Sequence, residues 1–403
     1  MSDPDSIARL LKSSAEFRLI VDLVRSVPQR PDEALLRTID WSRVLRLSQR
    51  HGITSMVYAQ ICQFGLVVPS EIADSFVTLY RERTARFLAQ GFETVRVAAA
   101  LRASGTDCLV LKGVAIANLL YSSNPAARQS TDIDIFVRPE SVSAADQVLQ
   151  QEGYERLLPN FDVPKEAREV VCQLLHAFEY VHRRDGYKLE LHHRLTANPH
   201  AMRSNFASLW EAALTIETNA GPVKCLEEKA TLIFLCCHSA AHAFSMLKWL
   251  CDLERAFDYI GLDKIPAIRN AAGSQFATNA LNLAGQLVDE VFGTRVCGRL
   301  GIQPKRSAET YVVSQLMSEN LPGGQRTWIS TFGELRLAFF LQQMGETFAF
   351  RINEFVRMTC DVRDTQIVRR GRRWLFAYLL LGPLTALIRW LRRRQTVPGV
   401  FWN

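Results

Sequence analysis

Three acidic residues interrupt stretches that are otherwise apolar, and their positions suit a metal site. Asp132 and Asp134 lie two residues apart in the run 132–137, so in a β-strand both side chains would face the same way. Glu190 stands between two leucines in a second strand-like run, 187–195. Like charges held close together repel, and burial adds to that cost unless a cation lies between them. If the two strands pair, three carboxylates can hold two Mg²⁺ ions about 3.5–4 Å apart, an arrangement that supports phosphoryl transfer.

A glycine turn upstream of the acids suits a phosphate. The apolar run 107–111 is followed by Lys112 and Gly113, and a short helical segment, 114–121, starts directly after them. Glycine lets the backbone approach a phosphate closely, and the N-terminus of a helix offers free N–H groups. The Lys112 side chain would add positive charge. We therefore expect nucleotide phosphates at Lys112 and Gly113, beside the acids.

The order of these motifs resembles that of a known superfamily. The segments LKGVAIANLLY, TDIDIFV and LELHHRL are similar to the glycine turn, the first acidic strand and the later acidic strand of the nucleotidyltransferase fold of the DNA polymerase beta superfamily. More narrowly, they resemble the bacterial family labelled uncharacterised nucleotidyltransferase. The likeness covers most of residues 40–260 and includes helical segments on both sides of the core. In those segments it rests on Trp41, His51, Gly52, His238, His242, Trp249 and Asp252.

The resemblance implies a role for several residues. The three acids match metal-binding carboxylates, Gly113 matches the phosphate-binding glycine, and Arg128 matches an arginine expected to contact phosphate. Two positions depart from the superfamily pattern: Val114 follows the glycine where Ser or Gly is usual, and the third acid, Glu190, is Asp in most members. The implied reaction moves a nucleoside monophosphate from an NTP to an acceptor hydroxyl or phosphate, with two Mg²⁺ ions as cofactors.

Further polar residues are expected to line the substrate cleft. His192 shares the strand face of the third acid, and His242, Lys248 and Asp252 come from the downstream helical region. His238 and His242 are four residues apart, a spacing that can bind zinc but also fits hydrogen bonding in the core or a wall that faces the substrate. The sequence has neither a nucleophile elbow nor a P-loop consensus, so those chemistries are not indicated.

The acceptor cannot be identified from the residues, and several functions stay open. The resemblance favours a small-molecule, peptide or glycan acceptor. One alternative is that the same scaffold transfers a sugar from a nucleotide sugar. Another is a non-catalytic nucleotide-binding module, although three acids at one site speak against it. Modification of RNA or DNA ends would require binding that weakens steeply with salt.

Hydrophobic periodicity predicts an α+β fold, with a small mixed-sheet nucleotidyltransferase core flanked by N-terminal and C-terminal helical regions. Asp185-Gly186 between two β-prone runs is a strong hairpin signal. We expect an N-terminal helical arm at 1–104, the α/β core at 105–225, a C-terminal helical region at 226–362 and a basic amphipathic tail at 363–403. Strands are expected at 107–111, 132–137, 154–158, 179–183 and 187–195, and helices at 6–27, 41–50, 69–88, 92–102, 114–121, 141–152, 227–246, 249–260, 269–292 and 306–319.

Positive charge is concentrated at the C-terminus of the chain, which has 403 residues and a formal net charge of +7. The segment 366–403 contains no acid and several clustered arginines, and without it the remaining chain is close to neutral. We therefore expect no specific nucleic-acid partner. Within this tail, 374–388 is uncharged but shorter than the roughly 20 residues of a spanning helix. A helix packed on the protein and an interfacial helix that contacts anionic lipid through 366–394 both remain open, and a true span is the weakest alternative.

The cysteine pattern and the N-terminus indicate the compartment. The nine cysteines are scattered, and no Cys-x-x-Cys occurs. Such a pattern is typical of reduced, buried thiols. The first residues include early acids and lack the apolar stretch of a signal peptide. We expect a cytoplasmic protein that could associate peripherally with membranes.

Overall fold

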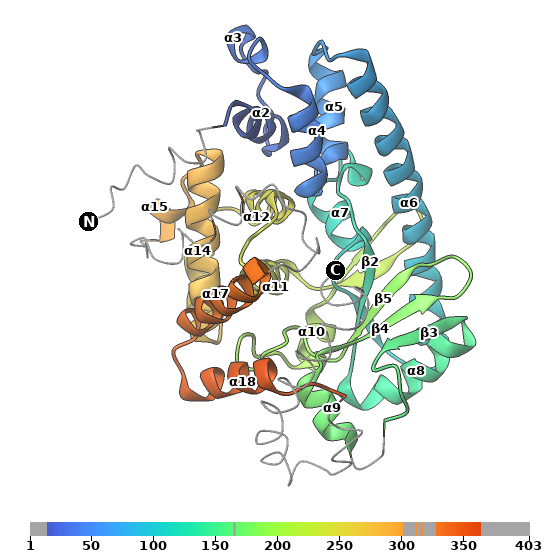
Figure 1. Ribbon diagram of the computed structural model, residues 1–403. Coiled ribbons are helices and arrows are strands. Elements are labelled where there is room, and N and C mark those ends of the chain that lie inside the picture. Colours follow the sequence, from blue (N-terminus) through green and yellow to red (C-terminus); the bar gives the residue numbers. More distant parts are fainter. Residues whose placement is uncertain (1–13, 164–166, 301–311, 313–315, 317–327, 364–403) are drawn as a thin grey trace.

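A seven-stranded mixed sheet forms the centre of the molecule (Figure 1). The computed structural model describes residues 14–163, 167–300, 312, 316 and 328–363. The strand order in the sheet is β3-β4-β5-β2-β1-β7-β6. The strands are β1 (Cys108–Val110), β2 (Asp132–Val137), β3 (Tyr154–Leu158), β4 (Ala177–His182), β5 (Lys188–His192), β6 (Leu214–Ile216) and β7 (Val223–Cys225).

Strand β2 lies in the middle of the sheet, with a partner on each side. It pairs antiparallel with β1 and parallel with β5. Strands β4 and β5 form an antiparallel hairpin around Asp185-Gly186, where Gly186 adopts a φ of 68°. A positive φ is unfavourable for most side chains, so the glycine permits the tight turn. The hairpin predicted from Asp185-Gly186 is therefore confirmed, as is the α+β class.

Helices α6 (Ser70–Ala103) and α8 (Val142–Gln151) cover one face of the sheet (Figure 1). The apolar side chains of β2, Ile133, Ile135 and Val137, are buried against them. Burying each such side chain contributes roughly 1.5–3 kcal/mol. This packing fixes which face of β2 is left for its acids, since neighbouring residues of a strand point to opposite faces.

Helix α6 differs from the expectation of two helices at 69–88 and 92–102. It is one helix of 34 residues that continues through Gly91. A glycine inside a helix costs only about 1 kcal/mol, which packing along a long helix easily offsets. A side chain at this position would contact the side chains of Val114 and Ala220, so the glycine also allows close packing.

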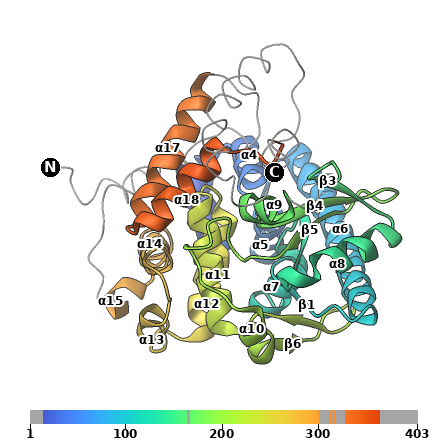
Figure 2. The same cartoon turned by 90° about the horizontal axis from the view of Figure 1, so that it is seen from below.

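The opposite face of the sheet packs against α11 (Glu228–Ala241) and α12 (Leu247–Ile260), with α14 (Gln275–Phe292) behind them (Figures 1 and 2). One hydrophobic core joins these helices to Phe136 of β2 and to the N-terminal helices. The N-terminal helices are α2 (Ala15–Val24), α3 (Glu33–Leu36), α4 (Trp41–Arg50) and α5 (Thr54–Phe64). The part of the chain that the structure describes also contains α7 (Val114–Leu120), η1 (Pro125–Ala127), η2 (Pro139–Ser141), α9 (Arg168–Leu174), α10 (Phe206–Ala212), α13 (Ile265–Asn270), α15 (Val296–Leu300), α17 (Trp328–Met344) and α18 (Phe348–Thr359).

The helix expected at 227–246 ends early. Helix α11 stops at Ala241, and Ala243 and Phe244 then adopt φ values of 51° and 48°. A positive φ at two residues that are not glycine breaks the helical path, and α12 begins only at Leu247. The chain therefore turns sharply between two buried helices, next to the acidic face of the sheet.

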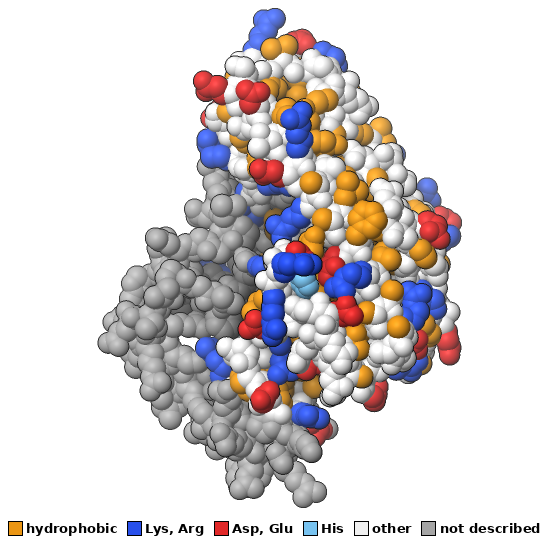
Figure 3. Space-filling model, turned by 90° about the vertical axis from the view of Figure 1, so that its right-hand side faces the viewer, with side chains coloured by type: hydrophobic (Ala, Val, Ile, Leu, Met, Phe, Trp, Pro, Cys, Tyr) orange, Lys and Arg blue, Asp and Glu red, His pale blue; other side chains and the backbone are white. Residues whose placement is uncertain are grey.

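Two expected features fall wholly or mostly outside the described residues. The tail at 363–403, including the proposed lipid contact at 366–394, is described only at residue 363. Of the helix expected at 306–319, only residues 312 and 316 are described, and both are helical. Among the described residues, no helix combines the length and the apolar character needed to cross a bilayer. On the face seen in Figure 3, the described basic and acidic side chains are interspersed, with hydrophobic atoms between them.

Candidate active site

The parallel register of β2 and β5 brings two of the three acids side by side. Asp134 lies directly opposite Glu190, and Phe136 lies opposite His192. Residues opposite each other in paired strands share a face, so Asp134, Glu190 and His192 all project away from α6. The side chain of Asp134 is fully buried, whereas that of Glu190 is 25% exposed. Glu190 of β5 therefore lies beside Asp134 of β2, as the sequence predicts if the two strands pair.

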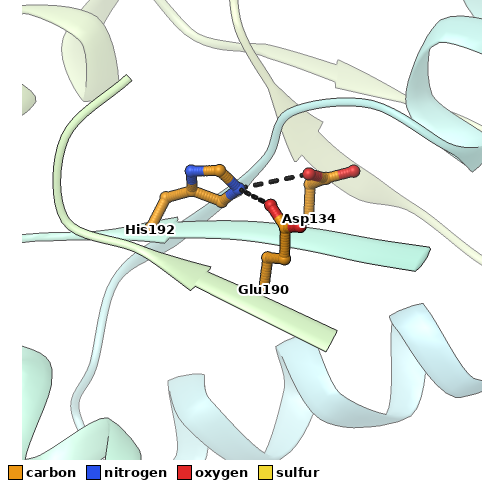
Figure 4. A group of neighbouring side chains, drawn as sticks. All are labelled: Asp134, Glu190 and His192. Carbon is orange, nitrogen blue, oxygen red and sulfur yellow. Dashed lines mark hydrogen bonds and ion pairs between the residues drawn. The ribbon is translucent and has the colours of Figure 1, made fainter. Parts of the chain in front are cut away.

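The His192 imidazole bridges the two carboxylates (Figure 4). Its Nε2 atom lies 3.1 Å from Asp134 Oδ1 and 3.1 Å from Glu190 Oε2. The Lys112 ammonium reaches the same aspartate from the end of β1, with Nζ 2.8 Å from Asp134 Oδ1. Two cationic groups from separate segments thus converge on one buried carboxylate.

These contacts decide the charge state of the cluster. Burial alone would raise the pKa of Asp134, but Lys112 and the hydrogen bond from His192 outweigh it and lower that pKa. The pKa of Glu190 is lowered in the same way, against burial, chiefly by His192. Burial opposes the charged form of His192, yet its hydrogen bonds to both carboxylates raise its pKa to about 9. At neutral pH both acids are therefore ionised and charged donors face them.

The donor set fits a divalent metal ion. One ligand atom each from Asp134, Glu190 and His192 lies within 4.8 Å of the others. The second oxygen of Asp134, Oδ2, is buried and has no hydrogen-bond partner among the described residues. An unpaired carboxylate oxygen in the interior costs free energy, which a bound cation would recover. This orphaned oxygen supports the expectation of a metal at the acids.

Asp132 lies two residues along β2 from Asp134, on the same face and at the end next to the glycine turn. Its carboxylate is partly exposed, and its nearest described hydrogen bond comes from the Thr131 hydroxyl at 3.4 Å. Asp132 is not part of the group of possible metal ligands formed by Asp134, Glu190 and His192. The sequence predicts Asp132 as the third ligand, and the structure has His192 at that place. The role of Asp132 as a metal ligand stays a prediction.

The glycine turn lies beside the acids, as its place in the sequence predicts. Gly113 adopts φ 59° and ψ −123° between β1 and α7, a conformation that disfavours any other residue. A β-carbon added there would lie 3.5 Å from Ser130 Oγ, and Ser130 Oγ donates to the Asp132 carbonyl at 3.1 Å. Val114 has no hydroxyl where the superfamily pattern often has one, but Ser130 places a hydroxyl beside the turn from the next loop, a position that the motifs do not reveal. In the sequence, Ser130 is marked only by its place two residues before Asp132.

Arg128 is held by a carboxylate of the helical region. Its Nε and Nη2 atoms donate to Asp252 Oδ1 at 2.9 Å and Oδ2 at 2.8 Å, and the Tyr121 hydroxyl donates to Asp252 Oδ1 at 2.8 Å. Both charged side chains are buried. The Nη1 atom of Arg128 lies 3.4 Å from the Gly113 carbonyl. The pair thus ties α12 to the glycine turn, while the predicted phosphate contact of Arg128 and the predicted cleft position of Asp252 remain untested.

A second group of rings lies where α11 ends and α12 begins. His238 and His242 have ring centroids 4.8 Å apart, and the Trp249 ring lies 5.6 Å and 5.2 Å from them. Burial lowers the pKa of His242 to about 4 and also lowers that of Lys248. Among the described residues, neither histidine belongs to a group of three possible metal ligands. The neutral rings can therefore form a wall, with Lys248 beside them.

The N-terminal arm fixes the start of α12. His51 Nδ1 accepts a hydrogen bond from the Leu247 backbone at 3.2 Å, and the His51 carbonyl accepts one from the Lys248 backbone at 3.3 Å. Gly52 has a φ of 66°, and an added β-carbon would lie 2.9 Å from Lys248 Cδ. The His-Gly pair noted in the sequence therefore positions the helix that carries Lys248 and Trp249.

Comparison with known proteins agrees with this geometry. The model of a family described as uncharacterised nucleotidyltransferase matches residues 37–293, which is more than half of the chain and includes every site residue named above. No curated protein and no solved structure matches the chain. The motifs in α4, β2, β5, α11 and α12 all fall within the matched range. The chain belongs to the uncharacterised nucleotidyltransferase family.

Proposed function

We propose that this protein moves a nucleoside monophosphate from an NTP to a hydroxyl or phosphate of a small-molecule, peptide or glycan acceptor. The observation that carries the proposal is the pairing of Asp134 with Glu190 across two parallel strands, beside the Gly113 turn. Membership of a nucleotidyltransferase family supports it. The order of a glycine turn before paired acids suits a triphosphate that lies along the end of the sheet.

Divalent metal ions are the proposed cofactors, with Mg²⁺ expected and two ions favoured by the three acids. Asp132, Asp134 and Glu190 would hold them. When bound, the ions would lower the pKa of an acceptor hydroxyl and neutralise the charge of the triphosphate. The lowered pKa values of Asp134 and Glu190, and the unpaired Oδ2 of Asp134, suit that role.

The chain's own residues would position the triphosphate. The backbone at Gly113 can approach a phosphate closely, and the Ser130 hydroxyl lies beside it. The Lys112 ammonium rests on Asp134, 2.8 Å away, and would turn to the triphosphate when another cation neutralises that acid. Placing these donors before the reaction stabilises the charge that develops on the phosphate oxygens.

The chemical step exchanges one bond at the α-phosphorus. The acceptor oxygen forms a bond to this atom, the bond to the bridging oxygen of the β-phosphate breaks, and pyrophosphate leaves. The acceptor's proton passes to a carboxylate of the cluster. His192, His242 and Lys248 would line the acceptor side of the cleft. They lie near the acids from β5, from the end of α11 and from α12, respectively.

A mass-spectrometric screen of NTPs and candidate acceptors tests this proposal. The wild type should give adducts with the mass of a nucleoside monophosphate and release pyrophosphate. Asp134→Asn should lower the rate at least about a hundredfold, the scale of losing one essential charge-stabilising group. Asp185→Asn makes the same chemical change at the exposed hairpin of the same sheet and should keep full activity.

Other outcomes separate the alternatives. A hexose adduct would indicate sugar transfer, and nucleotide binding without pyrophosphate release would indicate a binding module. Transfer that survives Asp134→Asn unchanged would show that the site lies elsewhere. The tail at 366–394 could bring the enzyme to a membrane-bound acceptor, which a vesicle co-sedimentation assay with anionic lipid would detect.

A further inference from the structure

The Nε2 atom of His192 lies among the acids predicted to bind metal, although the three-carboxylate pattern of the resemblance includes no histidine. It lies 3.1 Å from an oxygen of Asp134 and of Glu190, from within the same strand pair. A single Nε2–H cannot point well at two oxygens at once, so one of the two hydrogen bonds is necessarily poor. On the other side of the ring, Nδ1 is buried without a hydrogen-bond partner among the described residues.

The same distances match those between neighbouring ligands of one metal ion. Metal–ligand bonds to imidazole nitrogen and carboxylate oxygen measure about 2.0–2.2 Å. Two such ligands at right angles are then about 2.8–3.1 Å apart. Both separations from His192 Nε2 agree with this value, and all three ligand atoms lie within 4.8 Å of one another.

From this geometry we propose that His192 is itself a metal ligand, which completes a site of two carboxylates and one imidazole with Asp134 and Glu190. Lys112 and His192 both contact Oδ1 of Asp134, whereas Oδ2 of this buried residue has no hydrogen-bond partner among the described residues and is the independent sign of a free ligand position. Nε2 cannot hold a proton and a metal ion together, so binding would release one proton to solvent. The inference rests on the proposed function only in placing a divalent ion at the acids.

An imidazole in the ligand set changes which metal is preferred. Mg²⁺ favours oxygen ligands, whereas imidazole suits first-row transition ions. Compared with a site built from carboxylates alone, the site should therefore bind Mn²⁺ more tightly relative to Mg²⁺, because Mn²⁺ accepts an imidazole ligand more readily than Mg²⁺ does. His192 would then tune metal preference from its place in the cleft, a role beyond the substrate contact that the sequence predicts.

Electron spin echo spectroscopy of the full chain with one equivalent of Mn²⁺ tests the ligand directly. The wild type should show ¹⁴N modulation from a bound imidazole, and ¹⁵N-histidine labelling should change it. His192→Gln should abolish the modulation, because glutamine keeps a hydrogen-bond donor but no ring nitrogen. His193→Gln removes the neighbouring imidazole, whose ring packs on Phe178, and should keep the modulation.

Titration calorimetry with MnCl₂ and MgCl₂ gives a second readout. His192→Gln should weaken Mn²⁺ binding about tenfold or more and change Mg²⁺ binding much less. Mn²⁺ that binds the wild type without nitrogen modulation, or modulation that persists in His192→Gln, would overturn the proposal. So would failure of the wild type to bind Mn²⁺. Mn²⁺ binding without nitrogen modulation, or modulation that persists in His192→Gln, would refute the role of His192 alone. Transfer activity that depends on Asp134 would still support the proposed reaction in both cases.

Discussion

The buried pair of Arg128 and Asp252 offers a sharp test of whether this arginine serves mainly structure or phosphate binding. Its two hydrogen bonds are 2.9 Å and 2.8 Å long, and the side chains are only 6% and 2% exposed. At 2.8 Å and an effective dielectric constant of 20, the attraction between the charges is about 6 kcal/mol. Removing Arg128 leaves the buried Asp252 carboxylate with the Tyr121 hydroxyl as its hydrogen-bonding side chain among the described residues, so Arg128→Met should cost about 3–5 kcal/mol of unfolding free energy.

Urea unfolding followed by fluorescence measures this loss. Arg128→Lys should be destabilised nearly as much as Arg128→Met, because lysine cannot supply two parallel donors. The double variant Arg128→Met with Asp252→Leu removes both charges and should lose less stability than the sum of the single changes, by at least about 2 kcal/mol. A loss below about 1 kcal/mol in Arg128→Met, or strict additivity in the double variant, would refute this reasoning. Full stability of Arg128→Lys together with weakened NTP binding would instead favour the phosphate role.

Two further predictions concern pH and the glycine turn. Burial raises the pKa of Glu254 to about 7 from 4.5, so the folded state binds this proton more tightly. The contribution of Glu254 to stability should therefore fall by about 3 kcal/mol as pH rises from 4.5 to 7. Urea unfolding should show a flatter pH profile for Glu254→Gln, and an unchanged profile would contradict the assignment. Gly113→Ala should cost about 1–3 kcal/mol through backbone strain and also weaken NTP binding in calorimetry. Gly65→Ala, at a φ of 59° directly after α5, should lose stability alone, and equal NTP affinity in both variants would count against a phosphate role for Gly113.

Local sequence patterns predicted the elements that carry the site. Strand β2 has the bounds expected from its apolar spacing, and the hairpin forms at Asp185-Gly186. Alternation along a strand also placed Glu190 and His192 on one face. The order of the motifs then identified the family, because a glycine turn followed by two acidic strands can be recognised in the sequence without knowledge of the tertiary contacts.

Contacts between distant segments could not be predicted in the same way. His192 reaches Asp134 because the β2–β5 register sets Phe136 opposite it, and a shift of one residue would turn its side chain to the other face. Arg128 and Asp252 are 124 residues apart, and no periodicity links them. Strands β6 and β7 could not be predicted because each has three residues with a polar one in the middle, so they show neither a visible alternation nor the apolar run that marks β1.

The central claim is that the acids of β2 and β5 hold divalent ions beside an NTP at the Gly113 turn. A crystal structure with MnCl₂ and a non-hydrolysable NTP analogue, recorded with anomalous scattering, tests it most directly. The account predicts an anomalous peak within bonding distance of Asp134 and Glu190, with the α-phosphate next to it and the triphosphate on Gly113. Nucleotide bound away from these acids, or ordered nucleotide with no anomalous peak between the two strands, would contradict it.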